Sequence, residues 1–125
     1  MDIVEKTQSL LQKMLRKPLY VVQRIPNDLT RFEAFLEAHL QWAVEAEGRG
    51  VLFASGPFVE EEGVPGALGG MSVLRAETME DAKQILSDDP FIREKIYTPI
   101  IRKWLLMEGE LTVTVRFSNR SYSLK

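Results

Sequence analysis

The order of the apolar patterns along the chain is the feature that most restricts its fold. Short β-branched and aromatic runs occur at 18–25, 50–58, 70–77 and 96–107, and amphipathic stretches follow the first and third of them. These segments read β-α-β-β-α-β, two β-α-β units in tandem, which indicates a ferredoxin-like α+β fold. An amphipathic stretch at 2–16 predicts an added N-terminal helix, and alternation at 111–117 and 121–124 predicts a C-terminal β-hairpin.

Capping and proline positions refine these boundaries. Thr30-x-x-Glu33 is a capping-box pattern ahead of the apolar run of the first core helix, predicted over 29–47. Thr78-x-x-Asp81 opens the second core helix in the same way. Pro99 lies inside the fourth predicted strand, and because proline cannot donate to a strand ladder, we expect that strand at a sheet edge or a bulge.

Length and charge are those of an ordinary soluble globular protein. The chain has 125 residues, so we expect a single domain with an N-terminal helix (1–17), a core (18–107) and a hairpin (108–125). Its 16 basic residues are scattered among 18 acidic ones, which gives no support for a nucleic-acid partner. No stretch approaches the roughly 18 apolar residues of a membrane span, and the charged N-terminus is no signal peptide, so a cytoplasmic protein is expected.

Residue usage also restricts the chemistry. The chain has no cysteine, which excludes disulfide and thiolate chemistry. With a single histidine, His39, a histidine-rich metal site within one chain is not expected, and we predict no cofactor. The glycines at 69–70 do not form the G-x-G-x-x-G pattern that binds phosphate at the start of a helix.

One face of the predicted sheet lacks a cover. Four antiparallel strands with both helices on one side leave the other face bare, and a second copy of the chain covers it most simply. We therefore expect a homodimer or larger assembly, with a small molecule as the other partner and no membrane or nucleic acid.

His39 and Asp89 are the strongest candidates for chemistry. His39 lies three positions after Leu36 and four after Phe35, on the apolar stripe of the first core helix. Asp89 lies three positions after Leu86 and extends the inner stripe of the second core helix. If the two side chains converge, the carboxylate fixes the imidazole tautomer and raises its basicity, which yields a general base near neutral pH.

Both residues also have a purely structural interpretation. A histidine on an apolar stripe is often a core side chain bonded to a backbone carbonyl. Asp89 followed by Pro90 is a standard N-cap for a new helical turn, with Asp88 as its solvated neighbour. Trp42 and Trp104 are expected to be packing residues.

Weaker candidates for substrate binding lie on the strands. Ser55 and Gly56 end the second strand, where a hydroxyl or a backbone amide can meet a ligand. Arg75 and Arg102 lie on predicted strands and are candidates to pair with a substrate carboxylate, although ordinary surface arginines show the same pattern.

Three segments in this order resemble the YCII-related family: AHLQW (38–42), LFASGPF (52–58) and LSDDPFIREKIY (86–97). That family has a histidine before leucine in its first helix, a Gly-Pro at the end of its second strand and an Asp-Pro-aromatic after its second helix. The matching positions here begin with His39, Gly56 and Asp89, and the likeness covers residues 18–107.

This resemblance implies a dimeric α+β barrel, two ferredoxin-like units packed sheet to sheet, with an active site around the histidine and the aspartate. Some members look like lyases or dehydrochlorinases that act on ring compounds, and the superfamily includes muconolactone isomerases and cofactor-free monooxygenases. Many relatives carry an arginine where Leu36 stands here, and Arg31 is a candidate to replace its charge. The segments at 2–16 and 111–124 lie outside the common core.

Two functional hypotheses follow. The first is a small cofactor-independent enzyme of lyase or isomerase type, in which His39 removes or relays a proton and Asp89 orients the imidazole. Ser55 or the amides near Gly56 would then stabilise a developing enolate. The second is a non-catalytic module for small-ligand binding or assembly, in which His39 and Asp89 form a buried structural hydrogen bond.

Overall fold

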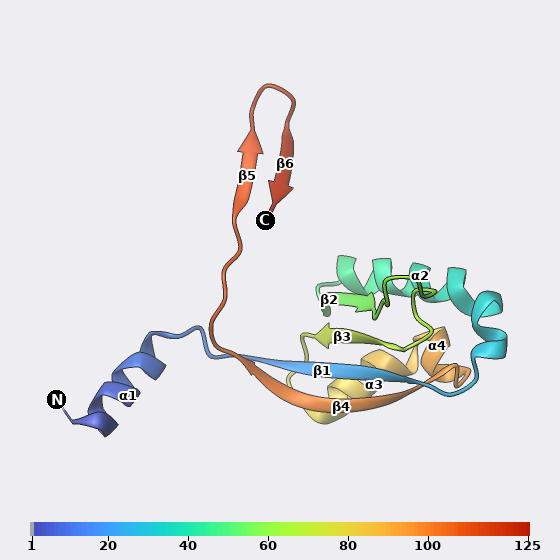
Figure 1. The fold of residues 1–125 in the computed structure, drawn as a ribbon, viewed down its shortest axis with the longest axis horizontal. Helices are drawn as coiled ribbons and strands as arrows, with labels where there is room; N and C mark the ends of the chain where they lie inside the picture. The colour runs from blue at the N-terminus through green and yellow to red at the C-terminus, as the bar shows by residue number, and fades with distance from the viewer. Residues whose placement is uncertain (1) are drawn as a thin grey trace. The chain divides into compact units, whose positions relative to one another are not determined.

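The computed structural model describes residues 2–125, and the chain divides into two compact units. The larger unit is Pro18–Leu105, and the smaller combines the residues up to Lys17 with Leu106–Lys125. The larger unit is built from β1 (Lys17–Pro26), the 3₁₀ turn η1 (Leu29–Arg31), α2 (Phe32–Gly48), β2 (Leu52–Pro57), β3 (Gly70–Leu74), α3 (Met79–Ser87), α4 (Pro90–Arg93) and β4 (Tyr97–Leu106) (Figure 1).

The four strands form one sheet in the order β2-β3-β1-β4. β3 pairs antiparallel with both β1 and β2, so that Ser72 is the register partner of Val22 on one side and of Ser55 on the other. This order and the helices between the strands confirm the predicted ferredoxin-like α+β class. β4, which contains Pro99, lies at an edge of the sheet as expected.

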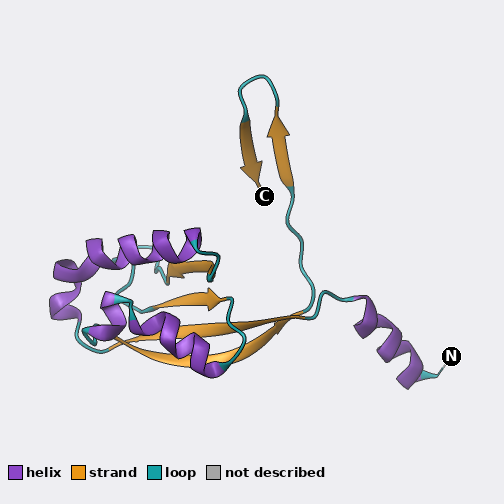
Figure 2. Cartoon of the chain, turned by 180° about the vertical axis from the view of Figure 1, so that it is seen from behind, coloured by secondary structure: helices purple, strands orange, loops and turns teal. Residues whose placement is uncertain are grey.

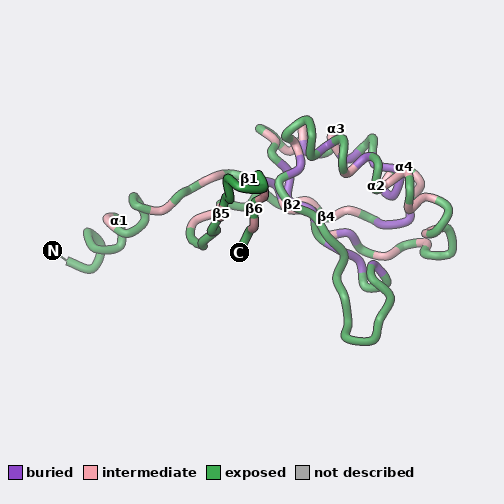
Figure 3. Tube along the Cα trace, turned by 90° about the horizontal axis from the view of Figure 1, so that it is seen from above, coloured by how far each residue is buried: buried purple, intermediate pink, exposed green. Residues whose placement is uncertain are grey.

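The core lies between the sheet and the helices, which gather on one side of the strands (Figure 3). Strand residues of alternating position face this layer, and Trp42 and Ala46 of α2 meet them. Leu40 of α2 is exposed, because the buried face of the helix passes through Trp42 and Ala46. The main cluster comprises Tyr20, Val22, Trp42, Ala46, Leu52, Leu74, Ala82 and Leu86.

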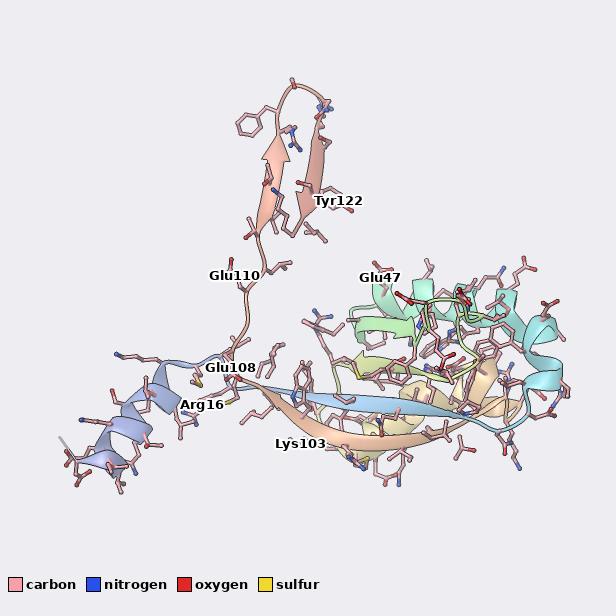
Figure 4. The ribbon with its side chains drawn as sticks, viewed as in Figure 1. Arg16, Glu47, Lys103, Glu108, Glu110 and Tyr122 are labelled. Atoms are coloured by element: carbon pink, nitrogen blue, oxygen red, sulfur yellow. The ribbon has the colours of Figure 1, made fainter. Side chains whose placement is uncertain are left out.

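The opposite face of the sheet holds an open hollow of about 340 Å³. Met71, Ile100 and Trp104 line it, and each is about two-fifths exposed. Large apolar side chains thus remain on the face that the helices do not cover. The hollow is lined by Val21, Gln23, Met71, Ile100, Arg102, Lys103 and Trp104, and Figure 4 labels Lys103 on β4.

The predicted capping box at Thr30 is wrong. The carboxylate of Asp28 accepts from both the backbone N–H and the hydroxyl of Thr30, and η1 follows it. α2 begins only at Phe32 and has no side-chain cap, because the Thr30 hydroxyl donates to Asp28 and Thr30 lies within η1, ahead of the start of the helix. Thr78 does cap α3, since its hydroxyl accepts from the backbone N–H of Asp81.

The smaller unit contains α1 (Ile3–Lys13), β5 (Val113–Arg116) and β6 (Ser121–Leu124), the helix and hairpin that the sequence predicts (Figure 2). No residue of α1 is buried. In the hairpin, Val113 pairs with Leu124 and Val115 with Tyr122 (labelled in Figure 4), so one face of the ribbon is apolar. No described helix is long and apolar enough to cross a bilayer.

Candidate active site

The side chains of His39 and Asp89 are in direct contact. Nδ1 of His39 lies 2.8 Å from Oδ1 of Asp89. Because an ionised carboxylate can only accept, Nδ1 carries the proton, and the lone pair of Nε2 is left free. Asp89 is fully buried whereas 13 % of the His39 side chain is exposed, so solvent reaches the imidazole but not the carboxylate.

Asp89 reaches His39 because a short helix, α4, begins directly after α3. Asp89 is the N-cap of α4, with Pro90 at its first position, and Oδ1 accepts from the backbone N–H of Phe91 at 3.0 Å. The Phe91 ring then stacks on the His39 imidazole, with centroids 4.2 Å apart and planes 14° apart. The predicted cap and the predicted histidine contact are therefore made by the same carboxylate.

Arg24 is the member of the site that the sequence analysis missed. Its Nη1 donates to Oδ2 of Asp89 at 2.5 Å, and its Nε donates to the hydroxyl of Ser72 at 2.9 Å. The side chain is only 5 % exposed. One sequence signal was present, because Arg24 follows Tyr20 and Val22 at two-residue spacing on a strand whose matching positions face the core.

Opposing effects act on the ionisation of Asp89. Burial by itself raises the pKa of Asp89, but the hydrogen bond from His39 and the positive charge of Arg24 outweigh it and hold that pKa below its ordinary value. The carboxylate is therefore charged at neutral pH and forms a buried ion pair with Arg24. That charge keeps the imidazole in the tautomer with its proton on Nδ1.

A chain of hydroxyls leads from Arg24 toward the surface. Ser72 is fully buried and accepts from Arg24, and its Oγ lies 2.8 Å from that of Ser55. In the hydrogen bond between Ser72 and Ser55, either hydroxyl can be the donor. Ser55 is exposed, so its hydroxyl is accessible to a ligand.

The glycine-rich loop after β2 contacts the backbone of Arg24 and the side chain of Tyr97. Gly69 has φ +90°, and a Cβ there would lie 2.1 Å from the carbonyl oxygen of Arg24. The buried hydroxyl of Tyr97 donates to the Gly66 carbonyl at 2.6 Å. Burial raises the pKa of Tyr97 although the charge of Arg24 acts in the opposite direction, so this hydroxyl remains protonated and serves as a donor.

The other predicted site residues lie apart from this cluster. Gly56 follows Ser55 on β2 and pairs with Met71. Arg75 packs over Phe53 and donates to the backbone carbonyl of Gly50, in the turn after α2, and Arg102 lines the hollow on the uncovered sheet face.

Arg31, the candidate to replace the arginine that the resemblance implies at the position of Leu36, forms its ion pair elsewhere. It pairs with Glu94 at 3.1 Å and is nearly half exposed. The buried positive charge of the site comes from Arg24 on β1 instead. Among residues 2–125, no group of three or more His, Asp or Glu side chains is placed to hold a metal ion.

In a comparison with known proteins, residues 18–104 match the family model of the YCII-related domain. Among solved structures, the chain is similar to the 5-chloro-2-hydroxyhydroquinone dehydrochlorinase TftG from Burkholderia phenoliruptrix AC1100, in complex with 2,5-dihydroxybenzoquinone. The TM-score is 0.57 at 18 % identity, over 69 % of this chain and 92 % of that one, a likeness of fold. No curated protein matches the chain.

Proposed function

Because the chain belongs to the YCII-related domain family, we propose that it is a small cofactor-independent enzyme of lyase or isomerase type that acts on a small ring compound. The observation that carries this proposal is the 2.8 Å contact between a buried, ionised Asp89 and a partly exposed His39. A base that is held in one tautomer and is partly exposed to solvent is suited to removing a proton from a bound substrate.

In the proposed reaction, Nε2 of His39 takes a proton from the substrate. The electron pair of the broken bond moves into the ring system and toward an attached oxygen. The imidazolium then returns the proton at another atom, which completes an isomerisation, or a leaving group departs with the electron pair, which completes an elimination. Neither route changes the oxidation state of the enzyme, and Asp89 stabilises the imidazolium throughout.

Ser55 is the proposed contact for a substrate oxygen. Its hydroxyl is exposed and, through Ser72 and Arg24, connected to the carboxylate that holds His39. The backbone amide of Gly56 is a second candidate donor on the same strand. Hydrogen bonds of this kind strengthen as negative charge develops on the substrate, so they favour the transition state over the bound substrate.

The similar solved structure is that of a dehydrochlorinase, which is the reason to try elimination first. The test uses 5-chloro-2-hydroxyhydroquinone with chloride release as the readout, and deuterium exchange of an unsaturated five-membered lactone and of 2-cyclohexenone in D₂O. With the reactive compound in hand, His39→Gln should lower the rate by about 10²–10⁴-fold. Normal turnover by His39→Gln would end the proposed mechanism.

A non-catalytic ligand-binding or assembly module is the second candidate. One observation favours it: Asp89 also caps α4 and neutralises Arg24, so the cluster stabilises the fold whether or not a reaction occurs. In that case His39→Gln should lower the melting temperature without affecting turnover of any compound tested.

We also propose that the uncovered sheet face joins two copies of the chain. Met71, Ile100 and Trp104 place half-exposed apolar surface around the 340 Å³ hollow, and a dimeric barrel would bury it. The apolar faces of α1 and of the hairpin are candidates to extend that contact.

A further inference from the structure

Two buried nitrogen donors beside the His39–Asp89 pair have no acceptor. Arg24 and Trp42 are each 5 % exposed, and within residues 2–125 neither Nη2 of Arg24 nor Nε1 of Trp42 has a hydrogen-bond partner. An enclosed donor without an acceptor is destabilising, and few occur in a folded protein. Two on neighbouring side chains therefore indicate a place where an acceptor oxygen binds.

The two donors belong to one cluster with the proposed base. The Arg24 guanidinium lies over the Trp42 ring, 5.7 Å from its centroid, and the His39 ring packs 5.9 Å from that of Trp42. The other two nitrogens of Arg24 are already taken by Asp89 and Ser72, which fixes the orientation of the guanidinium. Both free donors are enclosed, so an oxygen reaches them only when a neighbouring side chain moves aside.

The charges of the cluster restrict what kind of oxygen fits. The positive charge of Arg24 and the negative charge of Asp89 cancel at 2.5 Å. A neutral substrate that passes a proton to His39 creates one positive and one negative charge together, so the buried cluster stays neutral. A substrate that arrives with a carboxylate would add an uncompensated charge to a buried site, which is unfavourable.

We infer that Arg24 and Trp42 bind the oxygen of a neutral ring ketone or phenol, and that they hold the oxyanion formed when His39 takes the proton. In this step the C–H or O–H bond breaks, the proton moves to Nε2, and the electron pair resides on the oxygen that accepts from Nη2 and Nε1. The inference rests on the proposed function, and it names the class of substrate and two further binding residues for it.

Binding of a neutral phenol can be measured without knowing the natural substrate. The chain has two tryptophans, so a ¹H–¹⁵N spectrum contains two indole signals, one from Trp42 and one from Trp104 on the opposite sheet face. Hydroquinone is the neutral probe, and benzoate is a ring of similar size with a permanent negative charge. Hydroquinone should move the Trp42 signal saturably and leave that of Trp104 in place, and benzoate should move neither.

Two variants test the donors themselves. Trp42→Phe, which keeps the aromatic ring but loses the N–H, should weaken hydroquinone binding about tenfold or more, followed through the His39 signals. Trp104→Phe is the matched control and should bind as the native protein does. Arg24→Lys keeps the charge that faces Asp89 but loses the second amino group, and it should also weaken binding.

The results separate this inference from the proposed function. If hydroquinone leaves the Trp42 signal unmoved, or moves both indole signals alike, the inference is wrong, because no phenol oxygen then binds these donors specifically. Retained affinity in both Trp42→Phe and Arg24→Lys would overturn it as well. His39→Gln should still bind hydroquinone while losing proton transfer; unchanged proton transfer in that variant would refute the catalytic proposal and leave the binding result intact.

Discussion

Replacing Asp89 with asparagine tests how the buried polar cluster is held together. Asparagine has nearly the same volume and caps a helix about as well as aspartate, so the start of α4 should survive. The lost negative charge faces Nη1 of Arg24 at 2.5 Å and Nδ1 of His39 at 2.8 Å, and Arg24 is 5 % exposed. Removing one partner of such a buried pair leaves the other charge uncompensated, which lowers the free energy of unfolding by about 3–5 kcal/mol.

Urea unfolding, followed by tryptophan fluorescence and circular dichroism, measures this loss. A decrease of that size is a large part of the roughly 5–15 kcal/mol that stabilises a typical domain. Asp88→Asn is the matched control, because its side chain is exposed, and it should change stability by no more than about 0.5 kcal/mol. Combining Asp89→Asn with Arg24→Met should restore part of the stability, since neither charge then remains buried alone. Equal urea midpoints for Asp88→Asn and Asp89→Asn, or a double variant no more stable than Asp89→Asn, would refute this account.

Backbone conformation, pH and assembly are each open to a direct test. Gly69→Ala should lower the free energy of unfolding by more than about 1 kcal/mol, because φ is +90° and the new Cβ would lie 2.1 Å from the Arg24 carbonyl oxygen. Gly48→Ala has open space around it and should be neutral or stabilising by up to about 1 kcal/mol, and thermal melts compare the two. The pKa of Asp89 is lower in the folded than in the unfolded chain, so its contribution is present above about pH 4 and is lost as pH falls through the folded value. Urea midpoints between pH 6 and pH 3 should therefore fall more steeply for the native protein than for Asp89→Asn. Trp104→Glu should convert the proposed dimer to a monomer in light scattering, and an unchanged mass would contradict the sheet-face contact.

The order of the elements and the direction in which the key side chains face could be predicted from the sequence alone. Apolar residues at two-residue or three-to-four-residue spacing indicated the β-α-β-β-α-β order, and Pro99 indicated the edge position of β4. The same spacing placed His39 and Asp89 on the inner faces of their helices, and Asp89-Pro90 marked the start of a helical turn. These signals depend on neighbours close in the chain, which is why they are readable.

Which polar groups meet depends on the folded arrangement of the whole chain. Arg24 lies in a mostly apolar strand, and its contact with Asp89 joins positions 65 residues apart. The register of β3 places Ser72 between Val22 and Ser55, where its hydroxyl accepts from Arg24, and a shift of one residue would turn its side chain to the other face. Thr30 matched a capping pattern, but its hydroxyl donates to Asp28 and the chain enters α2 through a 3₁₀ turn. Ion pairs and hydrogen bonds form between atoms that folding brings together from distant parts of the chain. The pattern of neighbouring residues in the sequence does not contain the distance between such atoms in space.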